Sequence, residues 1–263
     1  MIQKIQANGI QMAYRFDGPA DAPVVVLSNS LMSNLTMWDD TVPALADKYR
    51  VLRYDTRGHG QTEATAAPYS IALLAADLVG LMDALGVAKA HVVGLSMGGM
   101  IAQYVGANFA DRVLSLGLAD TGSEMPPRSL WEDRLATMRA QGPAGMVDGT
   151  IARWFVPAFT AANPDKISAV RAMILGTATE GYLGCASAIR DMSQSTMLLK
   201  IKAPSLILVG KQDPATTVEQ ATVLHRLIDG SRLAVIDNAA HLSNIEQPGE
   251  FNGLLRGFID SVR

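Results

Sequence analysis

Short apolar runs alternate with helical patterns along most of this chain, and this alternation limits its fold more than any other feature. The run Val24–Leu27 is apolar at every position, as expected for a strand that helices cover on both faces of a parallel sheet. Together with a hairpin around the Asn8-Gly9 turn, such runs predict strands at residues 2–7, 10–16, 23–27, 50–54, 91–95, 112–119, 205–209 and 232–236. Helices are predicted at residues 34–48, 70–85, 97–109, 217–228 and 248–262. The chain is therefore predicted to have an α/β fold.

The alternation stops between residues 121 and 198, where helical patterns are broken by Pro126-Pro127 and later Pro and Gly residues. This segment holds six of the 13 Met and two of the three Trp, so it is rich in large and adaptable apolar side chains. It is predicted to be a helical lid (121–198) inserted into a core domain formed by residues 1–120 and 199–263. The alternative is a second helical layer whose Met side chains pack into the core.

The composition excludes several classes of protein and partner. With 263 residues, 49% of them hydrophobic, the chain is typical of a globular protein, so disorder, collagen and coiled coil are excluded. Lys and Arg number 22 against 25 Asp and Glu, which leaves no excess positive charge to attract nucleic acid or anionic lipid. No apolar stretch reaches the roughly 20 residues that a membrane span needs. A soluble protein without nucleic-acid or membrane partners is predicted.

Two features of the sequence indicate the cellular compartment of the protein. The N-terminal region has no apolar run long enough for the core of an export signal. The single cysteine, Cys185, cannot form an internal disulfide, and it is predicted to be a buried apolar side chain. Both features favour a cytoplasmic location.

The sharpest motif is Gly94-Leu-Ser96-Met-Gly98, which lies between a predicted buried strand and a predicted helix. A nucleophile on such a tight turn has strained backbone geometry, and the residues two positions away on either side must lack bulk. Gly94 and Gly98 meet this requirement. The motif therefore predicts that Ser96 is a nucleophile. The alternative is a glycine-rich connection in which Ser96 only caps the helix.

A base and an acid follow in the order that this turn predicts, each after a late strand. Asp213 follows the predicted strand 205–209, and His241 follows the predicted strand 232–236. Both side chains would project from the carboxyl ends of strands, where open α/β sheets build their sites. A serine hydroxyl is a poor nucleophile until an imidazole takes its proton, and a carboxylate on the far ring nitrogen fixes the tautomer. Ser96, His241 and Asp213 are therefore predicted as nucleophile, base and acid.

Other residues fit these roles less well. Asp237 is close to His241 in sequence and is the rival of Asp213, but its place immediately after the strand does not fit the expected order. Structural or surface roles are predicted for the remaining histidines, which are His59, His91 and His225.

An oxyanion hole for this chemistry is predicted from two backbone N–H groups. The first is that of Met97, directly after the nucleophile. The second comes from the loop after the third strand, where Leu31 is the donor by position.

With these motifs and the loop Asp55-Thr-Arg-Gly-His-Gly60, the whole chain resembles the α/β-hydrolase superfamily. The resemblance implies a mostly parallel eight-stranded sheet with helices on both faces and an inserted helical lid. Asn29-Ser30-Leu31 stands where most members have His-Gly before the oxyanion residue, and in this the chain is similar to the 3-oxoadipate enol-lactonases. Further similarity to them lies in Gly-Leu-Ser-Met-Gly-Gly-Met100-Ile-Ala-Gln103, Arg153-Trp-Phe155 and Gly181-Tyr-Leu-Gly-Cys-Ala186.

The resemblance implies hydrolysis of 3-oxoadipate enol-lactone to 3-oxoadipate, in the β-ketoadipate pathway of aromatic acid catabolism. It implies an acyl-enzyme mechanism with no metal or organic cofactor. The substrate would be a small lactone whose carboxylate arm needs a cationic partner when it is enclosed. The predicted substrate-binding residues are Trp131, Arg134, Arg153 and Trp154. The alternatives are surface ion pairs for the two Arg and places in the core for the two Trp.

Several other functions stay open. A general carboxylesterase, a carbon–carbon bond hydrolase or a cofactor-free perhydrolase could use the same three residues, because this fold hosts many chemistries. A haloalkane dehalogenase is disfavoured, since Ser96 stands where that reaction needs a carboxylate nucleophile. A non-catalytic ligand receptor is less favoured than an enzyme, because the predicted nucleophile, base and acid are all present.

Overall fold

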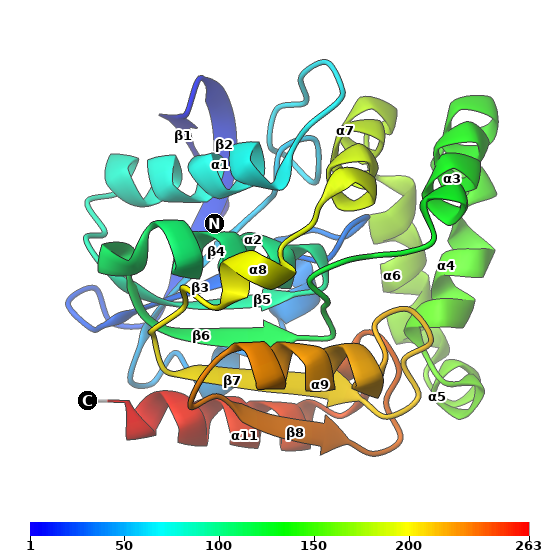
Figure 1. Cartoon of the computed structure of the whole chain (residues 1–263). Coiled ribbons are helices and arrows are strands. Elements are labelled where there is room, and N and C mark those ends of the chain that lie inside the picture. Colours follow the sequence, from blue (N-terminus) through cyan, green and yellow to red (C-terminus); the bar gives the residue numbers. More distant parts are fainter. Residues whose placement is uncertain (263) are drawn as a thin grey trace.

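The computed structural model describes residues 1–262, and its centre is an eight-stranded sheet (Figure 1). The strands lie in the order β1-β2-β4-β3-β5-β6-β7-β8. Within this sheet β2 is antiparallel to β1 and to β4, and every other neighbouring pair is parallel. The predicted mostly parallel sheet is therefore confirmed. The strands are β1 (Gln3–Ala7), β2 (Ile10–Asp17), β3 (Val24–Ser28), β4 (Arg50–Tyr54), β5 (Ala90–Leu95), β6 (Val113–Ala119), β7 (Ser205–Gly210) and β8 (Arg232–Ile236).

Helices cover both faces of the sheet. Leu116 and Gly117 are successive residues of β6, so they face opposite sides. The side chain of Leu116 lies against Gly106 of α2. A Cβ atom added to Gly117 would point toward Leu255 of α11. These two helices therefore lie on opposite faces, and α11 runs beside β7 and β8 (Figure 1). Outside residues 34–48 and 121–198 the helices are α1 (Ile71–Ala84), α2 (Met97–Asn108), α9 (Val218–Leu227), α10 (Ser243–Glu246), α11 (Pro248–Ser261) and the 3-10 helix η3 (Ala110–Arg112).

The single helix predicted at residues 34–48 is wrong. Two short 3-10 helices are found there instead, η1 (Leu35–Trp38) and η2 (Val42–Ala44). Pro43 is the physical reason, because it has no N–H to donate and its ring would collide with the carbonyl group four residues earlier in an α-helix. The Asn34 side chain caps η1 by accepting a backbone N–H.

Between β6 and β7 the strands stop and helices follow one another, as predicted for residues 121–198. Figure 1 shows α3 to α6 grouped beyond the arrowheads of β6 and β7, at the carboxyl edge of the sheet, with α7 beside α3. Met138 and Cys185 of this segment are fully buried in the core, whereas Met125 lines a cavity. The segment therefore combines a packed layer with a cavity wall. Its helices are α3 (Arg128–Gln141), η4 (Pro143–Gly145), α4 (Val147–Trp154), α5 (Pro157–Ala162), α6 (Pro164–Leu175), α7 (Thr179–Asp191) and α8 (Ser195–Leu198).

Candidate active site

Ser96 lies at the tight turn between β5 and α2, where the sequence predicted it. Its backbone has φ 57° and ψ −117°, a region that a residue with a side chain rarely adopts. The Ser96 N–H donates to Ala119 O at 2.9 Å, and the Thr121 hydroxyl donates to Ser96 O at 2.7 Å. Strain of this kind costs roughly 1–3 kcal/mol and is concentrated at functional sites. The surrounding strands hold Ser96 in a conformation that exposes its side chain to the edge of the sheet.

The glycines of the turn permit a close approach of backbones. A Cβ atom on Gly98 would lie 2.1 Å from Ser28 O, and one on Gly94 would lie 2.0 Å from Gly98 O. We expect Gly98→Ala to lower the free energy of unfolding by about 3 kcal/mol, because the crowded atoms belong to backbone that cannot rotate away. Gly253→Ala, at an exposed position of α11, is the matched control, since no atom lies within 4 Å of its Cβ position. Urea unfolding measures both variants, and equal stability of the two would contradict the packing argument.

The loops after β7 and β8 bring Asp213 and His241 together. His241 Nδ1 lies 2.8 Å from Asp213 Oδ2, and both side chains are buried. The carboxylate also accepts the N–H groups of Ala215 and Thr216 and the Thr216 hydroxyl. Burial disfavours both charges, but their attraction outweighs it, so the pKa of Asp213 is lowered and the pKa of His241 is raised. The pair is therefore a carboxylate beside an imidazole that gains a proton readily.

The rival acid and the other histidines lie elsewhere. Asp237 is exposed, and its carboxylate pairs with Lys211 at 2.7 Å. It makes no hydrogen bond to His241 within residues 1–262. The remaining histidines have other hydrogen-bond partners, namely Met32 N–H for His59, Ser115 for His91 and Ser231 for His225.

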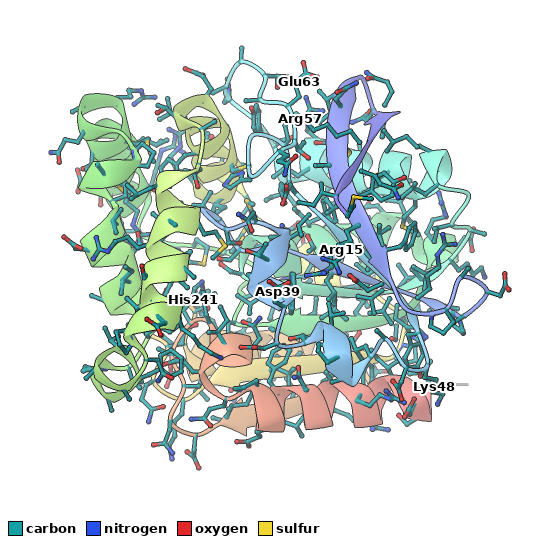
Figure 2. The ribbon with its side chains drawn as sticks, turned by 180° about the vertical axis from the view of Figure 1, so that it is seen from behind. Arg15, Asp39, Lys48, Arg57, Glu63 and His241 are labelled. Carbon is teal, nitrogen blue, oxygen red and sulfur yellow. The ribbon has the colours of Figure 1, made fainter. Side chains whose placement is uncertain are left out.

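One cavity brings Ser96 and His241 together with residues of the helical segment. Figure 2 shows His241 beside these helices. Leu31 lines the cavity, whereas Asp213 lies against the far nitrogen of His241, outside the lining. The side chain of Met97 is fully buried, and Met97 is the first residue of α2. The lining also includes all four residues predicted to bind substrate, which are Trp131, Arg134, Arg153 and Trp154.

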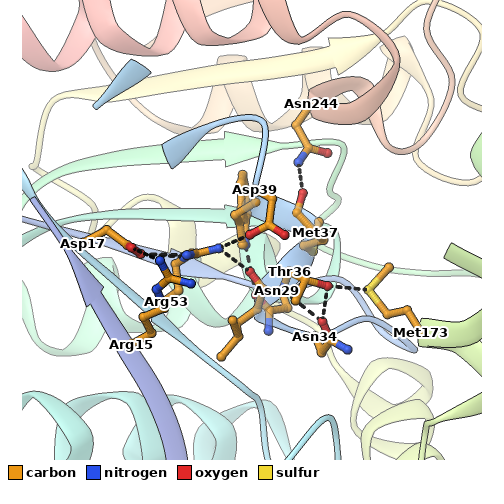
Figure 3. A network of polar contacts seen from close by, with 12 residues as sticks. Arg15, Asp17, Asn29, Asn34, Thr36, Met37, Asp39, Arg53, Met173 and Asn244 are labelled. Atoms are coloured by element: carbon orange, nitrogen blue, oxygen red, sulfur yellow. Dashed lines mark hydrogen bonds and ion pairs between the residues drawn. The ribbon is translucent and has the colours of Figure 1, made fainter. Parts of the chain in front are cut away.

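The loop that carries Leu31 is anchored on both sides. Asn29 Oδ1 accepts the indole N–H of Trp38 at 2.9 Å, and Asn29 Nδ2 donates to a backbone carbonyl of β4 at 2.7 Å. Asn29 belongs to the polar network drawn in Figure 3. The N–H of Met32 donates to His59 Nε2 at 3.1 Å. Burial lowers the pKa of His59 to about 4, so its ring is neutral at pH 7 and Nε2 can accept this bond. The sequence did not indicate that His59 holds this loop.

Arg134 and Arg153 reach the cavity without an acidic partner among residues 1–262. The Arg134 guanidinium lies over the Trp131 ring, 4.7 Å from its centre, and Arg153 donates to the Thr150 hydroxyl at 3.1 Å. Burial lowers the pKa of both groups, and repulsion by Arg134 adds to the effect on Arg153, whose pKa falls to about 10. Both remain cationic at pH 7. The cavity therefore offers two positive charges, which favour an anionic group on a ligand. The alternative of surface ion pairs does not apply to them.

The helical segment is fixed to the loop that carries His241. Trp154 O accepts the N–H of Leu242 at 3.1 Å, and the Glu246 carboxylate accepts the N–H of Val156 at 2.7 Å. The Trp154 ring stacks on the His241 ring, with centres 6.5 Å apart and planes at 28°. Trp154 is thus both a buried core residue and a wall of the cavity, so its two interpretations apply together.

Several residues of the cavity were not predicted from the sequence. Tyr182 lines it from α7, and the only signal for it was its place in the stretch Gly181–Ala186. The Ser30 hydroxyl also lines it, is buried, and has no hydrogen-bond partner within residues 1–262. No local pattern marks such residues, because distant elements bring them to the cavity.

A serine on the tight turn after a central parallel strand is typical of the alpha/beta hydrolase fold, and this chain belongs to that family. The family model with that description matches residues 23–248. The chain is 34% identical to 3-oxoadipate enol-lactonase 2 of Acinetobacter baylyi over 248 residues, which are 94% of this chain and 92% of that protein. The crystal structure of the enol-lactonase from Burkholderia xenovorans LB400 is similar with a TM-score of 0.97 and 36% identity, covering 98% of this chain and 100% of the other.

A third relative carries a different name. The chain is 27% identical over 247 residues to a putative carbamate hydrolase, RutD, of Pseudomonas savastanoi pv. phaseolicola, which covers 92% of this chain and 95% of that protein. The predicted resemblance to enol-lactonases is confirmed, and the two enol-lactonase relatives support an ester hydrolase that acts on a small ester or lactone. Within residues 1–262 no helix has the length and apolar character to cross a membrane. No group of three or more His, Cys, Asp and Glu in those residues could hold a metal ion.

Proposed function

We propose that this chain hydrolyses an enol-lactone with a carboxylate arm, and that 3-oxoadipate enol-lactone is the substrate. The observation that carries the proposal is the pair of guanidinium groups on Arg134 and Arg153, which line the same cavity as Ser96 and His241. A buried carboxylate needs such partners, because leaving it unpaired costs several kcal/mol. The names of the relatives from Acinetobacter and Burkholderia support the choice of a lactone. The product, 3-oxoadipate, would belong to the breakdown of aromatic acids.

In this proposal Ser96 is the nucleophile, His241 the base and Asp213 the acid that orients the base. Ser96 Oγ attacks the lactone carbonyl while His241 takes its proton, and the N–H groups of Leu31 and Met97 bind the oxyanion. Collapse of the intermediate breaks the bond to the ring oxygen, which leaves as an enolate and receives the proton from His241. The opened chain remains attached to Ser96 as an ester. His241 then takes a proton from the water that attacks this ester, and returns it to Ser96 Oγ as the acid is released.

We assign residues 121–198 the role of a lid over the core domain formed by 1–120 and 199–263. Trp131 supports this role, since its indole N–H donates to Met125 O at 2.9 Å and fixes the ring under the Arg134 guanidinium. Enclosure by the lid would exclude water and strengthen the attraction between the guanidinium groups and a carboxylate. The reaction needs no metal or organic cofactor, because Ser96 and His241 supply the nucleophile and the proton transfers.

The test of this proposal is the decay of ultraviolet absorbance of freshly prepared 3-oxoadipate enol-lactone. Fast decay with the wild-type chain and none with Ser96→Ala would support both the substrate and the nucleophile. Absence of decay, with hydrolysis of p-nitrophenyl acetate intact, would reject the lactone and leave a carboxylesterase. Absence of both reactions would reject the hydrolytic role of these residues.

A carbamate hydrolase is the second candidate, and the relative named RutD is the observation that favours it. The same nucleophile and base could attack the carbonyl of a carbamate ester, which differs from the lactone in carrying a nitrogen on the carbonyl carbon. Release of ammonia or carbon dioxide from carbamate esters, measured beside lactone decay at equal enzyme concentration, separates the two functions. A larger kcat/KM for the carbamate would replace the first proposal by the second.

The role of the two guanidinium groups leads to a prediction about selectivity. We expect Arg134→Gln and Arg153→Gln each to raise KM for the lactone by roughly 10- to 100-fold, because each loses a hydrogen bond from a charged group to the carboxylate. Hydrolysis of the neutral p-nitrophenyl acetate should stay near the wild-type rate. Arg171→Gln is the matched control, since Arg171 is exposed on α6 and pairs with Asp148. An equal loss on both substrates would instead indicate that the two Arg only maintain the fold.

A further inference from the structure

A second buried aspartate lies close to Asp213 and His241. Asp120 immediately follows β6 and is fully buried. Its backbone has φ 42°, a left-handed conformation that is uncommon for a residue other than glycine. The Asp120 N–H donates to Leu208 O at 2.9 Å, so the residue continues the pairing of β6 with β7 beyond the end of β6. The mechanism above makes no use of this residue, and sequence patterns did not single it out.

The side chain of Asp120 joins the two loops that carry the predicted acid and base. Oδ1 accepts the N–H of Gly210 at 2.7 Å, and Gly210 ends β7 three residues before Asp213. Oδ2 lies 2.5 Å from Ser243 Oγ, and Ser243 is two residues after His241. Asp120 itself belongs to neither loop. One carboxyl group therefore bonds to both chain segments at points close to the imidazole and its carboxylate.

The loop that carries Asp213 and the loop that carries His241 also pack closely against each other near Gly210. A Cβ atom on Gly210 would lie 2.1 Å from Ala240 O, so the backbone before His241 packs directly on the end of β7. The Gln212 N–H donates to Ala239 O at 2.9 Å, which adds a bond between the loops. A small shift of either loop would therefore change the 2.8 Å distance between His241 Nδ1 and Asp213 Oδ2.

We propose that Asp120 is a positioning residue, whose carboxyl group holds the Asp213 loop and the His241 loop at the separation that lets the imidazole bond to the carboxylate. This inference rests on the proposed hydrolytic roles of Ser96, His241 and Asp213. Asp120 acts through these residues and does not itself touch the substrate, since it is not part of the cavity lining. Its effect should therefore be on kcat and on His241, with KM unchanged.

The charge state of Asp120 suits this role. The charged and titratable groups that act on it are Asp213 and His241. Burial, together with the negative charge of Asp213, raises the pKa of Asp120 to about 8, so the group is mostly protonated at pH 7. Oδ2 accepts the Ser243 hydroxyl in the structure, and a protonated carboxyl can keep this bond in either direction while Oδ1 accepts the Gly210 N–H. The residue then joins the loops without placing a second negative charge beside His241.

The conservative variant Asp120→Asn would preserve both bonds, because an amide oxygen can accept from Gly210 and an amide N–H can donate to Ser243. We expect Asp120→Asn to keep kcat within about threefold of wild type, with an unchanged pH profile of kcat/KM. Asp120→Ala removes both bonds, and we expect kcat to fall roughly 100-fold with KM unchanged, as for a misplacement of about 1 Å. Asp237→Ala is the control, since Asp237 lies in the loop before His241 but makes its hydrogen bond to Lys211.

The experiment compares these variants of the full chain by kinetics and by ¹H NMR. The kinetics use the lactone and p-nitrophenyl acetate, so a failure of the lactone proposal leaves the Asp120 test intact on the acetate. The NMR readout is the downfield signal of the His241 Nδ1–H bonded to Asp213, which needs no turnover. We expect this signal to be lost in Asp120→Ala and kept in Asp120→Asn.

Two results would overturn the proposal. The first is a wild-type kcat and NMR signal in Asp120→Ala, which would show that the loops need no such link. The second is an equal loss in Asp120→Asn and Asp120→Ala, which would show that the charge of the group matters and not its hydrogen bonds. If Asp120→Ala does not fold, the variant Ser243→Ala tests the proposal instead. We expect it to lower kcat about tenfold at constant KM, and an unchanged kcat would reject the proposal.

Discussion

Replacement of Ser96 by alanine should lower kcat for the lactone by about 10⁶-fold, because loss of the nucleophile removes the acyl-enzyme path altogether. The residual reaction would come from the oxyanion hole and from substrate binding, which together retain roughly 10³-fold acceleration over water in comparable sites. KM should change little, since the carboxylate partners Arg134 and Arg153 are untouched. The measurement is lactone decay under saturating substrate, with enough variant protein to observe a slow reaction.

The control for this result separates chemistry from folding. Alanine can occupy the φ 57° conformation of Ser96 as poorly as serine does, so the thermal unfolding midpoint should stay close to that of the wild type. Ser193→Ala is the matched serine variant, because Ser193 is exposed and bonds to Glu124 outside the cavity. Its activity should equal that of the wild type. If Ser96→Ala kept activity within tenfold of wild type, Ser96 would not be the nucleophile.

The fold was largely predictable because its signals are local. Apolar runs such as that of β3 indicate buried parallel strands without reference to any distant residue. The hairpin of β1 and β2 also follows from a local signal, the Asn8-Gly9 turn, where both residues have positive φ. The wrong helix at residues 34–48 shows the limit of periodicity. Its large apolar residues, Leu35, Met37, Trp38, Val42 and Leu45, are buried, but Pro43 and the short caps divide the segment into 3-10 turns.

The positions of the candidate site residues were predictable only where a residue has a fixed place relative to a strand end. Ser96, Asp213 and His241 each follow a strand, so the topology alone brings them to one edge of the sheet. Asp120 follows β6 in the same way, but its bonds to Gly210 and Ser243 depend on how two distant loops pack. Tyr182 and Ser30 reach the cavity only because the helical segment lies over the sheet edge. Such contacts depend on side-chain packing across long sequence separations, which no pattern in the chain specifies.

Charge is distributed unevenly around the cavity, and this bears on how a substrate would lie. The positive groups of Arg134 and Arg153 come from the helical segment, whereas Ser96 comes from the sheet edge. A lactone with a carboxylate arm could place the arm toward the guanidinium groups and its carbonyl toward Ser96. The binding energy of the arm would then hold the lactone in the cavity with its carbonyl toward Ser96, which lowers KM. A neutral ester lacks this anchor, which is why the two Arg variants should distinguish the substrates.

Asp213→Asn should lower kcat by about 10⁴-fold, the effect expected when the imidazole is held in the wrong tautomer. The amide can donate to His241 Nδ1, so the proton would move to the nitrogen that must accept from Ser96. The pH profile should change as well. Burial lowers the pKa of His241, and the Asp213 charge outweighs that effect and raises it above 6.5. The neutral base is the active form, so wild-type kcat/KM rises with pH through this raised pKa. Without the carboxylate the rise should shift to lower pH.

Asp237→Asn is the matched control for this variant, because it makes the same chemical change in the acid closest to His241 in sequence. Asp237 is exposed and pairs with Lys211, so its replacement should cost less than about 1 kcal/mol of stability and leave kcat unchanged. The comparison decides between the two acids that follow late strands. A large loss in Asp237→Asn and a small loss in Asp213→Asn would exchange their roles. A small loss in both would mean that neither acid orients His241, and it would reject the proposed role of a carboxylate in the reaction.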